Sequence, residues 1–385
     1  MAGASFEAAR MESAREQLVA LALALGFDDA RWVEVRPAPV EVERLRAWLT
    51  DGRAAGLEYM ARGVERRADP GLSLAGALSA LVLGASHAHP EPPIPEGGLR
   101  VGRVARYAWS RDYHLALQEP LLALVDLART LRVGARAYTD HGPVLERGLA
   151  ARAGLGWRSR SSQIVSQKLG GFVTLAVVLA DLTAPPTAPE HPDRCGRCTT
   201  CVTACPTAAI GPDRSVDARL CLSYWTIEHR GPIPWSIRPL LGDHLFGCDD
   251  CVACCPWTVR AGSLSSLLRP EPELAHPDLG AFFGTSNRAF GRSFAGTAFE
   301  RPGRKGMARN AALVIGNFGR SDGLPLLEAG LADDAYTVRE ASAWAVGRLE
   351  ALGLTAAERL AATVEQSGGE LALALQAGRG RQPKP

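Results

Sequence analysis

The stretch that decides the chemistry of this chain is CGRCTTCVTACP, residues 195–206. Its cysteines follow the spacing Cys-x2-Cys-x2-Cys-x3-Cys-Pro, which is the spacing of bacterial ferredoxins. In such a segment three thiolates of a tight loop bind one [4Fe-4S] cluster, and the fourth binds a second cluster. A structural zinc site needs only two Cys-x2-Cys pairs. Two zinc sites are therefore the weaker alternative, because they leave the Cys-Pro end of the motif unexplained.

A second cysteine set, Cys248-x2-Cys251-x3-Cys255-Pro256, repeats the last three quarters of that motif. Leu245 stands where its first cysteine would be, and the isolated Cys221 is the obvious replacement. Crossed ligation, as in two-cluster ferredoxins, then predicts two ligand sets. They are Cys195, Cys198, Cys201 and Cys255 for one cluster, and Cys205, Cys221, Cys248 and Cys251 for the other.

Cys254 is the ninth cysteine and is left over. Either Cys254 or Cys255 could complete the first set, and Cys255 is favoured because it has the x3 spacing and the following proline. Cys254 is then a small buried apolar residue. Two neighbouring clusters form a path for electrons, which implies a terminal acceptor in another part of the chain.

Length and composition indicate a folded protein of several domains. The chain has 385 residues, of which 46% are hydrophobic and 22% charged, and its net charge of +2 neither supports nor excludes a polyanionic partner. The first residues mix charged and apolar side chains, unlike a signal peptide, and no apolar run reaches the ~18 residues of a membrane helix. We therefore expect a soluble, cytoplasmic protein whose cysteines bind metal.

The region before the cysteines alternates predicted helices and strands, which indicates an α+β or α/β domain. The predicted strands are Ala80–Ala85, Val101–Trp109, Ala135–Thr139 and Phe172–Leu179. The predicted helices are Glu16–Leu25, Tyr113–Leu131 and Val144–Ala153. A proline-rich linker, residues 182–192, ends this domain.

The region after the cysteines repeats itself. RNAALVIGNFG (309–319) superposes on EASAWAVGRLE (340–350) with Gly316 on Gly347, and Leu324–Leu331 is predicted as a helix between them. This pattern is typical of a short helical-repeat module of the HEAT type.

Longer motifs carry a family resemblance. ARAYTDHGPVLERGLAARAGLGW (135–157), CLSYWTIEHRGPIP (221–234) and FGCDDCVACCPW (246–257) resemble the epoxyqueuosine reductases, and the resemblance runs from about residue 10 to residue 350. It implies an overall α+β protein with an N-terminal cobalamin-binding α/β domain that is nitroreductase-like or reductive-dehalogenase-like. The expected layout is that catalytic domain at 1–184, a ferredoxin-like two-cluster domain at 185–265, a basic connecting segment at 266–304, HEAT-like helical repeats at 305–377 and a disordered tail at 378–385.

The resemblance also implies an activity. Electrons would pass through two [4Fe-4S] clusters to base-off cobalamin, and epoxyqueuosine at the wobble position of tRNA would be reduced to queuosine. Asp140 matches the proton donor of the family. Such a donor must be protonated, which we expect from a raised pKa at a buried position after the strand Ala135–Thr139. Without the resemblance, Asp140 is more simply a cap of the turn at His141-Gly142.

The remaining site residues are also implied by the resemblance. The expected cobalamin contacts are Arg62, Trp109, Asp140, Ile164, Leu175, Thr226 and Glu228. The chain departs from the family after Trp157, where Ser159, Arg160 and Ser161 replace a Gly-Lys-Asn element and leave the geometry of this loop open. The strand that follows has Ala176-Val177 in place of a Gly-Glu pair.

A basic stretch lies between Ser286 and Asn310, with phenylalanines interleaved. A solvated loop is the default interpretation, but the family uses this junction for the tRNA backbone, so the expected RNA contacts are Arg301, Arg304, Lys305 and Arg309. The expected partners are tRNA with a queuosine-type anticodon and an external low-potential electron donor, with a monomeric chain and no membrane.

Two other functions stay open at this point. One is a cobalamin-dependent reductase of a small molecule, which would not need the basic stretch or the repeats. The other is a non-enzymatic two-cluster electron-transfer module, against which the long region before the first cysteine counts. Cobalamin binding separates the second alternative from the two enzymes, and tRNA binding separates the two enzymes.

Overall fold

The structure is a computed structural model that describes residues 2–186, 189–262 and 265–381, with side chains from residue 7 onward. By its contacts the chain divides into two compact units. Unit 1 comprises residues 1–90, 111–217 and 250–269, and unit 2 comprises residues 91–110, 218–249 and 270–385. Both units are discontinuous and cross the predicted boundaries, so the five-part layout stays a prediction.

Unit 1 is built on a four-stranded antiparallel sheet with the strand order β1-β2-β7-β4. The strands are β1 (Asp29–Glu34), β2 (Ser79–Ser86), β4 (Ala135–Tyr138) and β7 (Val173–Ala180). All residues of β2 are buried, and β2 pairs with β7 from Ser79↔Ala180 to Ser86↔Val173. Continuous apolar runs are typical of central strands covered on both faces. The strands predicted at 80–85, 135–139 and 172–179 are therefore confirmed.

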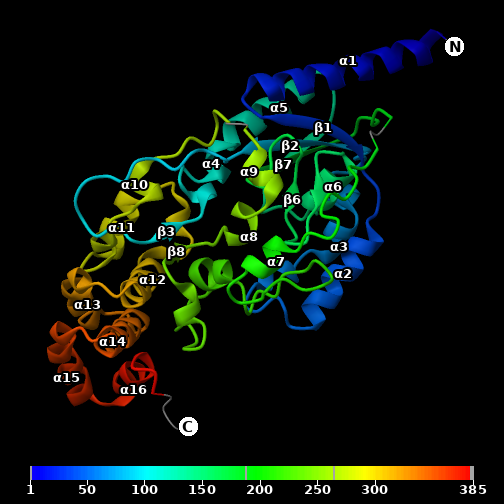
Figure 1. Cartoon of the computed structure of the whole chain (residues 1–385). Coiled ribbons are helices and arrows are strands. Elements are labelled where there is room, and N and C mark those ends of the chain that lie inside the picture. The colour runs from blue at the N-terminus through cyan, green and yellow to red at the C-terminus, as the bar shows by residue number, and fades with distance from the viewer. Residues whose placement is uncertain (1, 187–188, 263–264, 382–385) are drawn as a thin grey trace. The chain divides into compact units, whose positions relative to one another are not determined.

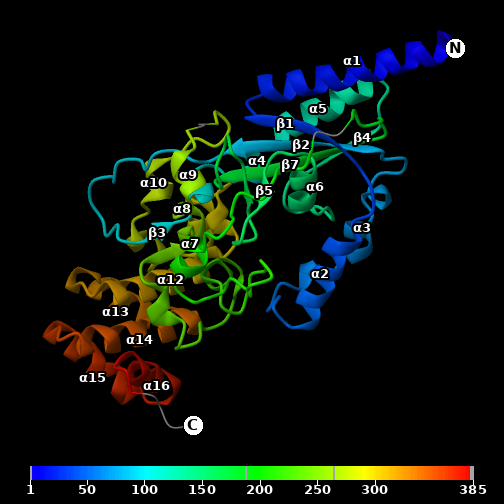
Figure 2. The ribbon, with the colours of Figure 1, turned by 45° about the vertical axis from the view of Figure 1, so that its right-hand side comes forward.

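Helices cover the two faces of this sheet (Figures 1 and 2). One core contains Leu18 of α1 (Ala2–Ala24) and Leu124 of α5 (Gln118–Thr130), packed with Leu81 and Leu83 of β2. The other contains Leu149 of α6 (Glu146–Arg152) with the alternate strand residues. Successive side chains of a strand point to opposite faces, so each strand serves both cores.

Shorter elements complete unit 1. They are α2 (Pro39–Thr50), α3 (Val64–Ala68), α4 (Tyr113–Ala116), β5 (Trp157–Arg158), β6 (Ile164–Val165), α7 (Thr200–Ala204), α8 (Asp250–Ala253) and α9 (Pro256–Arg260). The predicted helix Tyr113–Leu131 is interrupted at Leu117, between α4 and α5. Pro120 explains the break, because a proline lacks the N–H of a continuous helix and its ring would meet the carbonyl of Ala116.

Unit 2 contains two short parallel strands, β3 (Arg103–Val104) and β8 (His244–Phe246), and a π-helical turn, η4 (Tyr224–Glu228). The strand predicted at Val101–Trp109 is wrong beyond β3. The Arg106 N–H bonds the Asp249 carboxylate at 2.7 Å, and a 3-10 turn follows at Arg106–Ala108.

Helices make up the rest of unit 2. They are α10 (Pro272–Ala275), α11 (Asn287–Ser293), α12 (Gly303–Phe318), α13 (Leu324–Leu331), α14 (Tyr336–Ala351), α15 (Glu358–Ser367) and α16 (Gly369–Gly378). The predicted repeat falls on α12 and α14, and the helix predicted between them is α13. Of the predicted tail 378–385, residues 382–385 lie outside the described residues.

The two superposed glycines explain the repeat. A Cβ at Gly316 of α12 would lie 2.8 Å from the Ala345 Cα of α14, and a Cβ at Gly347 of α14 would meet the Leu375 carbonyl of α16. Each glycine therefore lets its helix approach the next one closely. None of the described helices combines the length and apolar character needed to cross a membrane.

Candidate functional site

The first predicted ligand set lies in unit 1, on the loop before α7, in α7 itself, which contains Cys201, and on the segment from α8 to α9. Burial and the nearby Cys195 raise the pKa of Cys201, and Cys255 acts on it in the same direction. Burial, Cys201 and Cys255 raise the pKa of Cys254 to about 11. Both Cys254 and Cys255 thus interact with Cys201, so the choice of Cys255 as the ligand continues to depend on the spacing and on Pro256.

Two of the predicted ligands accept hydrogen bonds from the surrounding fold. The Trp157 indole N–H lies 3.4 Å from the Cys195 Sγ, and the Ala209 N–H lies 3.2 Å from the Cys205 Sγ. N–H donors to ligand sulfurs stabilise the negative charge of an iron–sulfur site. The residues present therefore fit a [4Fe-4S] site.

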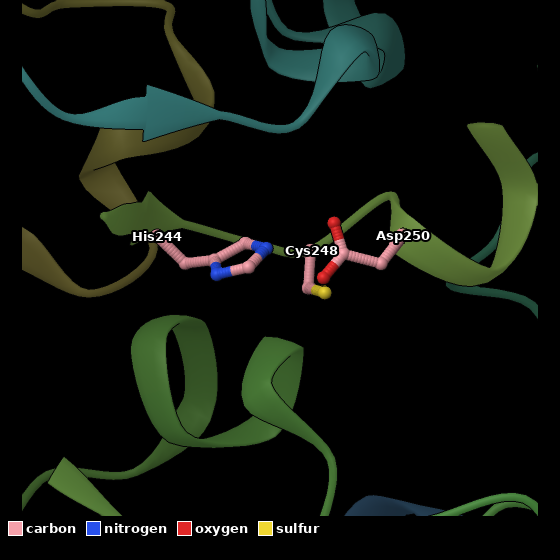
Figure 3. Close-up of side chains that lie close together, drawn as sticks. All are labelled: His244, Cys248 and Asp250. Carbon is pink, nitrogen blue, oxygen red and sulfur yellow. The ribbon is translucent and has the colours of Figure 1, made fainter. Parts of the chain in front are cut away.

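The second predicted set is divided between the units, with Cys205 and Cys251 in unit 1 and Cys221 and Cys248 in unit 2. Leu245, which stands where the first cysteine of this motif would be, is fully buried in β8. The neighbouring His244 is a candidate that the sequence reasoning missed. Ligand atoms of His244, Cys248 and Asp250 lie within 4.8 Å of one another in this short stretch of chain (Figure 3).

The hydrogen bonding of His244 fixes its tautomer. The His244 ring is buried, and its Nδ1 donates to the Leu241 carbonyl at 2.8 Å. In a neutral ring the Nε2 then keeps its lone pair, which is the arrangement of a histidine that can bind a metal. The sequence could have indicated this candidate, because His244 directly precedes Leu245, the position where the motif lacks its cysteine.

Asp140 follows β4 after one residue, Thr139, in a short loop that leads into α6. It is exposed, where the sequence reasoning expected a buried carboxyl, and its φ of +56° is left-handed. The Tyr113 hydroxyl donates to the Asp140 Oδ2 at 2.6 Å, and the Asp140 N–H donates to the Glu146 Oε1 at 2.7 Å. Asp140 is thus held by a side-chain bond and by a backbone bond.

The carboxyl beside this loop is that of Glu146, a half-buried residue. Burial, and after it the charge of Asp140, raises the pKa of Glu146 to about 8, against smaller opposing effects of the Asp140 N–H and of Arg147. The group with the raised pKa is therefore the neighbour of the predicted donor. The sequence reasoning missed Tyr113 and Glu146, although Glu146 lies in the motif 135–157 and Tyr113 begins the predicted helix Tyr113–Leu131.

Histidines surround the same loop. The His141 Nδ1 donates to the Thr139 carbonyl at 2.6 Å, and the Thr139 hydroxyl donates to the Leu175 carbonyl at 2.9 Å. The His114 and His141 rings lie 5.3 Å apart. His114 itself is paired with Asp112 at 2.8 Å.

The predicted cobalamin contacts fall into two groups. In unit 1, Ile164 is buried in the sheet core, and Leu175, half-buried, packs on that core beside Thr139. Of the two, only Leu175 is partly accessible, and it lies near Asp140 through its bond to Thr139. Arg62 is exposed, with its nearest charged partner Glu58 at 3.9 Å.

In unit 2 the side chains of Trp109 and Thr226 are engaged within the fold. The buried Trp109 indole donates to the Val104 carbonyl at 2.8 Å. The Thr226 hydroxyl, which is also buried, donates to the Leu222 carbonyl at 2.8 Å and accepts the Gly247 N–H at 2.9 Å. The polar atoms of these two side chains therefore have partners within the fold, and their expected cofactor contacts stay predictions.

Glu228 is also engaged, since its carboxylate accepts from the Arg301 guanidinium at 2.9 Å.

Two of the four predicted RNA contacts are corrected. Arg309 is 1% exposed and Arg304 is 7% exposed. Arg304 forms a buried ion pair with Asp333 at 2.6 Å. Arg309 donates to the carbonyls of Trp225, His229 and Gly231 at 2.7–2.8 Å.

The interleaved phenylalanines of the same stretch are core residues. Phe290, Phe294 and Phe299 are all buried, and the ring centroids of Phe290 and Phe294 lie 4.9 Å apart. The exposed basic residues of the stretch are Arg288, Arg292, Arg301 and Lys305.

The loop that departs from the family keeps a closed geometry. It joins β5 to β6, with Ser159 N–H bonded to the Gln163 carbonyl at 2.8 Å. The left-handed residue of this turn is Ser162, with φ +67°, so position 159 does not need the freedom of a glycine. Arg160 donates to the Gly196 carbonyl at 2.8 Å, which links the β5–β6 loop to the first cysteine loop.

Comparison with known proteins defines the class first. Residues 194–258 match a 4Fe-4S double cluster binding domain. With the cysteine spacing and the N–H donors at the sulfurs, this makes the chain an iron–sulfur protein of the two-cluster class. Residues 67–141, which include Asp140, match the family profile described as epoxyqueuosine reductase QueG, DUF1730.

Relatives then define the family. The epoxyqueuosine reductase of Xanthomonas campestris pv. campestris is 35% identical over 311 residues, which cover 79% of this chain and 87% of that protein. This chain belongs to the epoxyqueuosine reductase family.

Solved structures of epoxyqueuosine reductases share the fold. One, with a tRNA-Tyr epoxyqueuosine-modified stem loop, superposes with a TM-score of 0.84 at 27% identity over 96% of this chain and 99% of its own. Another, from Bacillus subtilis, superposes with a TM-score of 0.85 at 27% identity over 97% of this chain and 100% of its own. In that structure the catalytic loop, which carries an aspartate, is swung out of the active site.

Proposed function

We propose that this chain reduces epoxyqueuosine to queuosine at the wobble position of tRNA. The observation that carries the proposal is the presence in one chain of the double-cluster segment, residues 194–258, and of the Asp140 loop within the segment that matches the family. The first supplies electrons and the second supplies protons, and this reaction needs both.

The reaction consumes two electrons and two protons. Both C–O bonds of the epoxide break, a C=C double bond forms between the two carbons, and the oxygen leaves as water. Oxygen is a poor leaving group as an alkoxide, so an acid must protonate it. The proposed acid is Asp140, which is exposed and can reach a bound substrate.

The cofactors would be two [4Fe-4S] clusters and base-off cobalamin. The proposed cluster ligands are the two sets of four cysteines given above, and the half-buried Leu175, with Ile164 behind it in the core, would contact the corrin ring beside Asp140. Arg62, Trp109, Thr226 and Glu228 stay proposed contacts of the cobalamin. When bound, the cobalamin would supply a strongly reducing centre for opening the epoxide.

The chain's own residues control the proton. The Tyr113 hydroxyl orients the Asp140 carboxyl through its 2.6 Å bond, and Thr139 ties the base of the loop to β7. The Bacillus subtilis relative has its aspartate-bearing loop swung out of the active site, so we propose that the Asp140 loop of this chain also alternates between two positions.

The proposed RNA-binding surface consists of the exposed side chains Arg288, Arg292, Arg301 and Lys305 on α11, α12 and the turn before α12. Exposed guanidinium and ammonium groups bind phosphates without reading sequence, and their binding weakens as salt rises. The stem loop bound to a relative of the same fold favours an RNA ligand here.

The finer assignments follow from the same proposal. Unit 1 would correspond to a nitroreductase-like or reductive-dehalogenase-like cobalamin domain with the ferredoxin-like segment, and helices α12 to α16 would be HEAT-like repeats. The chain would act in the cytoplasm as a monomer, with an external low-potential electron donor.

The test is the tRNA of a strain that lacks this gene. Nucleoside analysis by mass spectrometry should show epoxyqueuosine in place of queuosine. A plasmid copy of the gene should restore queuosine, and a copy with Asp140→Asn should not. Unchanged queuosine in the deletion strain would overturn the proposal.

A further inference from the structure

The Asp140 loop contains a second carboxyl, that of Glu146, the first residue of α6. Its Oε1 accepts the Asp140 N–H at 2.7 Å across six residues of chain. The left-handed φ of Asp140, +56°, belongs to the same arrangement. A residue in this region of backbone conformation needs the surrounding structure to hold it there. The Glu146 carboxyl provides such a restraint directly at the Asp140 peptide.

The other contacts of the loop restrain different atoms. Tyr113 holds the side chain of Asp140, and Thr139 is tied to the Leu175 carbonyl at the end of β7. His141 bonds back to the Thr139 carbonyl. Among the described residues, the Asp140 N–H bonds the Glu146 carboxyl, so the loss of Glu146 should free the backbone of the loop while Thr139 stays anchored.

The ionisation of Glu146 bears on the same restraint. The carboxyl lies in a half-buried position, and the charged groups that act on it are Asp140, which raises its pKa, and Arg147, which lowers it. A neutral carboxyl can accept the N–H without placing a second negative charge beside Asp140. An ionised carboxyl accepts more strongly but suffers both burial and repulsion by Asp140.

We propose that Glu146 is the positioning residue of the proton donor: its neutral carboxyl holds the Asp140 loop in the conformation of this structure, here called the inward position, and its ionisation releases the loop. The proposal deepens the proposed function and depends on Asp140 being the donor. It assigns to Glu146 no contact with the substrate.

The sign of the pH dependence follows from linkage. In the inward position the pKa of Glu146 is about 8, whereas a loop released to water returns it toward 4.5. The inward position therefore binds the proton more tightly. Its advantage is complete below the lower pKa and is lost as the pH rises through about 8. The carboxyl of the inward loop is about one tenth ionised at pH 7 and about nine tenths at pH 9.

The experiment measures loop protection and turnover on the full, cluster-loaded chain. Backbone hydrogen exchange of the peptide spanning residues 139–145, corrected for intrinsic rates, is followed from about pH 6.5 to 9.5 in wild type and in Glu146→Gln and Glu146→Ala. Glu358→Gln, an exposed glutamate at the start of α15, is the matched control.

In wild type, protection should fall by ~10-fold across pH 8, and Glu358→Gln should behave in the same way. Glu146→Gln keeps an acceptor oxygen but cannot ionise, so the fall in protection should disappear. Glu146→Ala should lose protection at every pH and lower turnover by ~10- to 10²-fold, since misplacing a catalytic group by ~1 Å has that effect.

Wild-type protection in Glu146→Ala, or an unchanged pH dependence in Glu146→Gln, would overturn the proposal. The exchange measurement needs no substrate, so it stands apart from the proposed function. A fully active Asp140→Asn chain would refute Asp140 as the donor and with it the role proposed for Glu146, whatever the exchange shows of the loop.

Discussion

Arg309 was predicted to contact RNA, but it is buried in the structure. The variant Arg309→Met tests whether its role is structural. Methionine keeps much of the length of the side chain and removes the guanidinium. The three carbonyls that lose their donor belong to Trp225, His229 and Gly231, in and after the η4 turn. That turn follows the predicted ligand Cys221, so the perturbation lies close to a cluster ligand.

The magnitude follows from two opposing effects. Hydrogen bonds donated by a charged group stabilise by ~1.5–3 kcal/mol each, so three of them contribute ~4.5–9 kcal/mol. Burial lowers the pKa of Arg309 from 12.5 to about 9, which at ~1.4 kcal/mol per pKa unit is an opposing cost of ~5 kcal/mol. Arg309→Met should therefore destabilise the fold by about 2 kcal/mol, and by ~4 kcal/mol at most.

The assay is calorimetric melting of the reconstituted chain together with tRNA binding at several salt concentrations. A loss of ~2 kcal/mol lowers the melting temperature of a domain of this kind by ~4–8 °C. Lys305→Met is the matched control, because Lys305 is exposed on the same helix. It should leave the melting temperature within ~1 °C and reduce the salt dependence of tRNA binding by about one unit.

An Arg309→Met chain that melts like wild type but binds tRNA more weakly would refute this reasoning. It would mean that the guanidinium leaves its buried carbonyl partners to reach the RNA.

Three further predictions concern the clusters, the donor and the helical region. Anaerobic reconstitution should give about eight iron atoms per chain; Cys221→Ala should halve this number and Cys254→Ala should leave it unchanged, as iron analysis will show. Asp140→Asn should keep the iron content but lower turnover by ~10²–10⁴-fold, and equal turnover would exclude Asp140 as the acid. Glu340→Gln removes one charge of the buried Arg238–Glu340 pair, whose side chains are 1% and 5% exposed, and should cost ~3–5 kcal/mol in urea unfolding; a cost under ~1 kcal/mol would contradict the burial.

The features that the sequence predicted well are local ones. The central strands β2 and β7 are continuous apolar runs, and such runs need no knowledge of the rest of the chain. The cysteine spacing is equally local, because three ligands of a cluster come from one short loop. The interruption of the predicted Tyr113–Leu131 helix was also a local matter, and Pro120 was the overlooked signal.

The features that it missed depend on tertiary contacts. β1 has no strong local pattern and exists because β2 offers it a partner. Arg304 and Arg309 lie in a basic stretch that resembles a solvated surface, but Asp333 and the carbonyls after η4 bring them inside. The raised pKa of Glu146 was not expected, because the burial behind it depends on how α6 meets the sheet.

The most direct test of the central claim uses the purified chain, reconstituted anaerobically with iron, sulfide and cobalamin. It is incubated with epoxyqueuosine-containing tRNA and a strong one-electron reductant, and the nucleosides are analysed by mass spectrometry. We expect epoxyqueuosine to lose one oxygen atom and become queuosine, with no conversion when cobalamin or the clusters are left out. Recovery of unchanged epoxyqueuosine from the complete mixture, with all cofactors shown to be bound, would contradict the account.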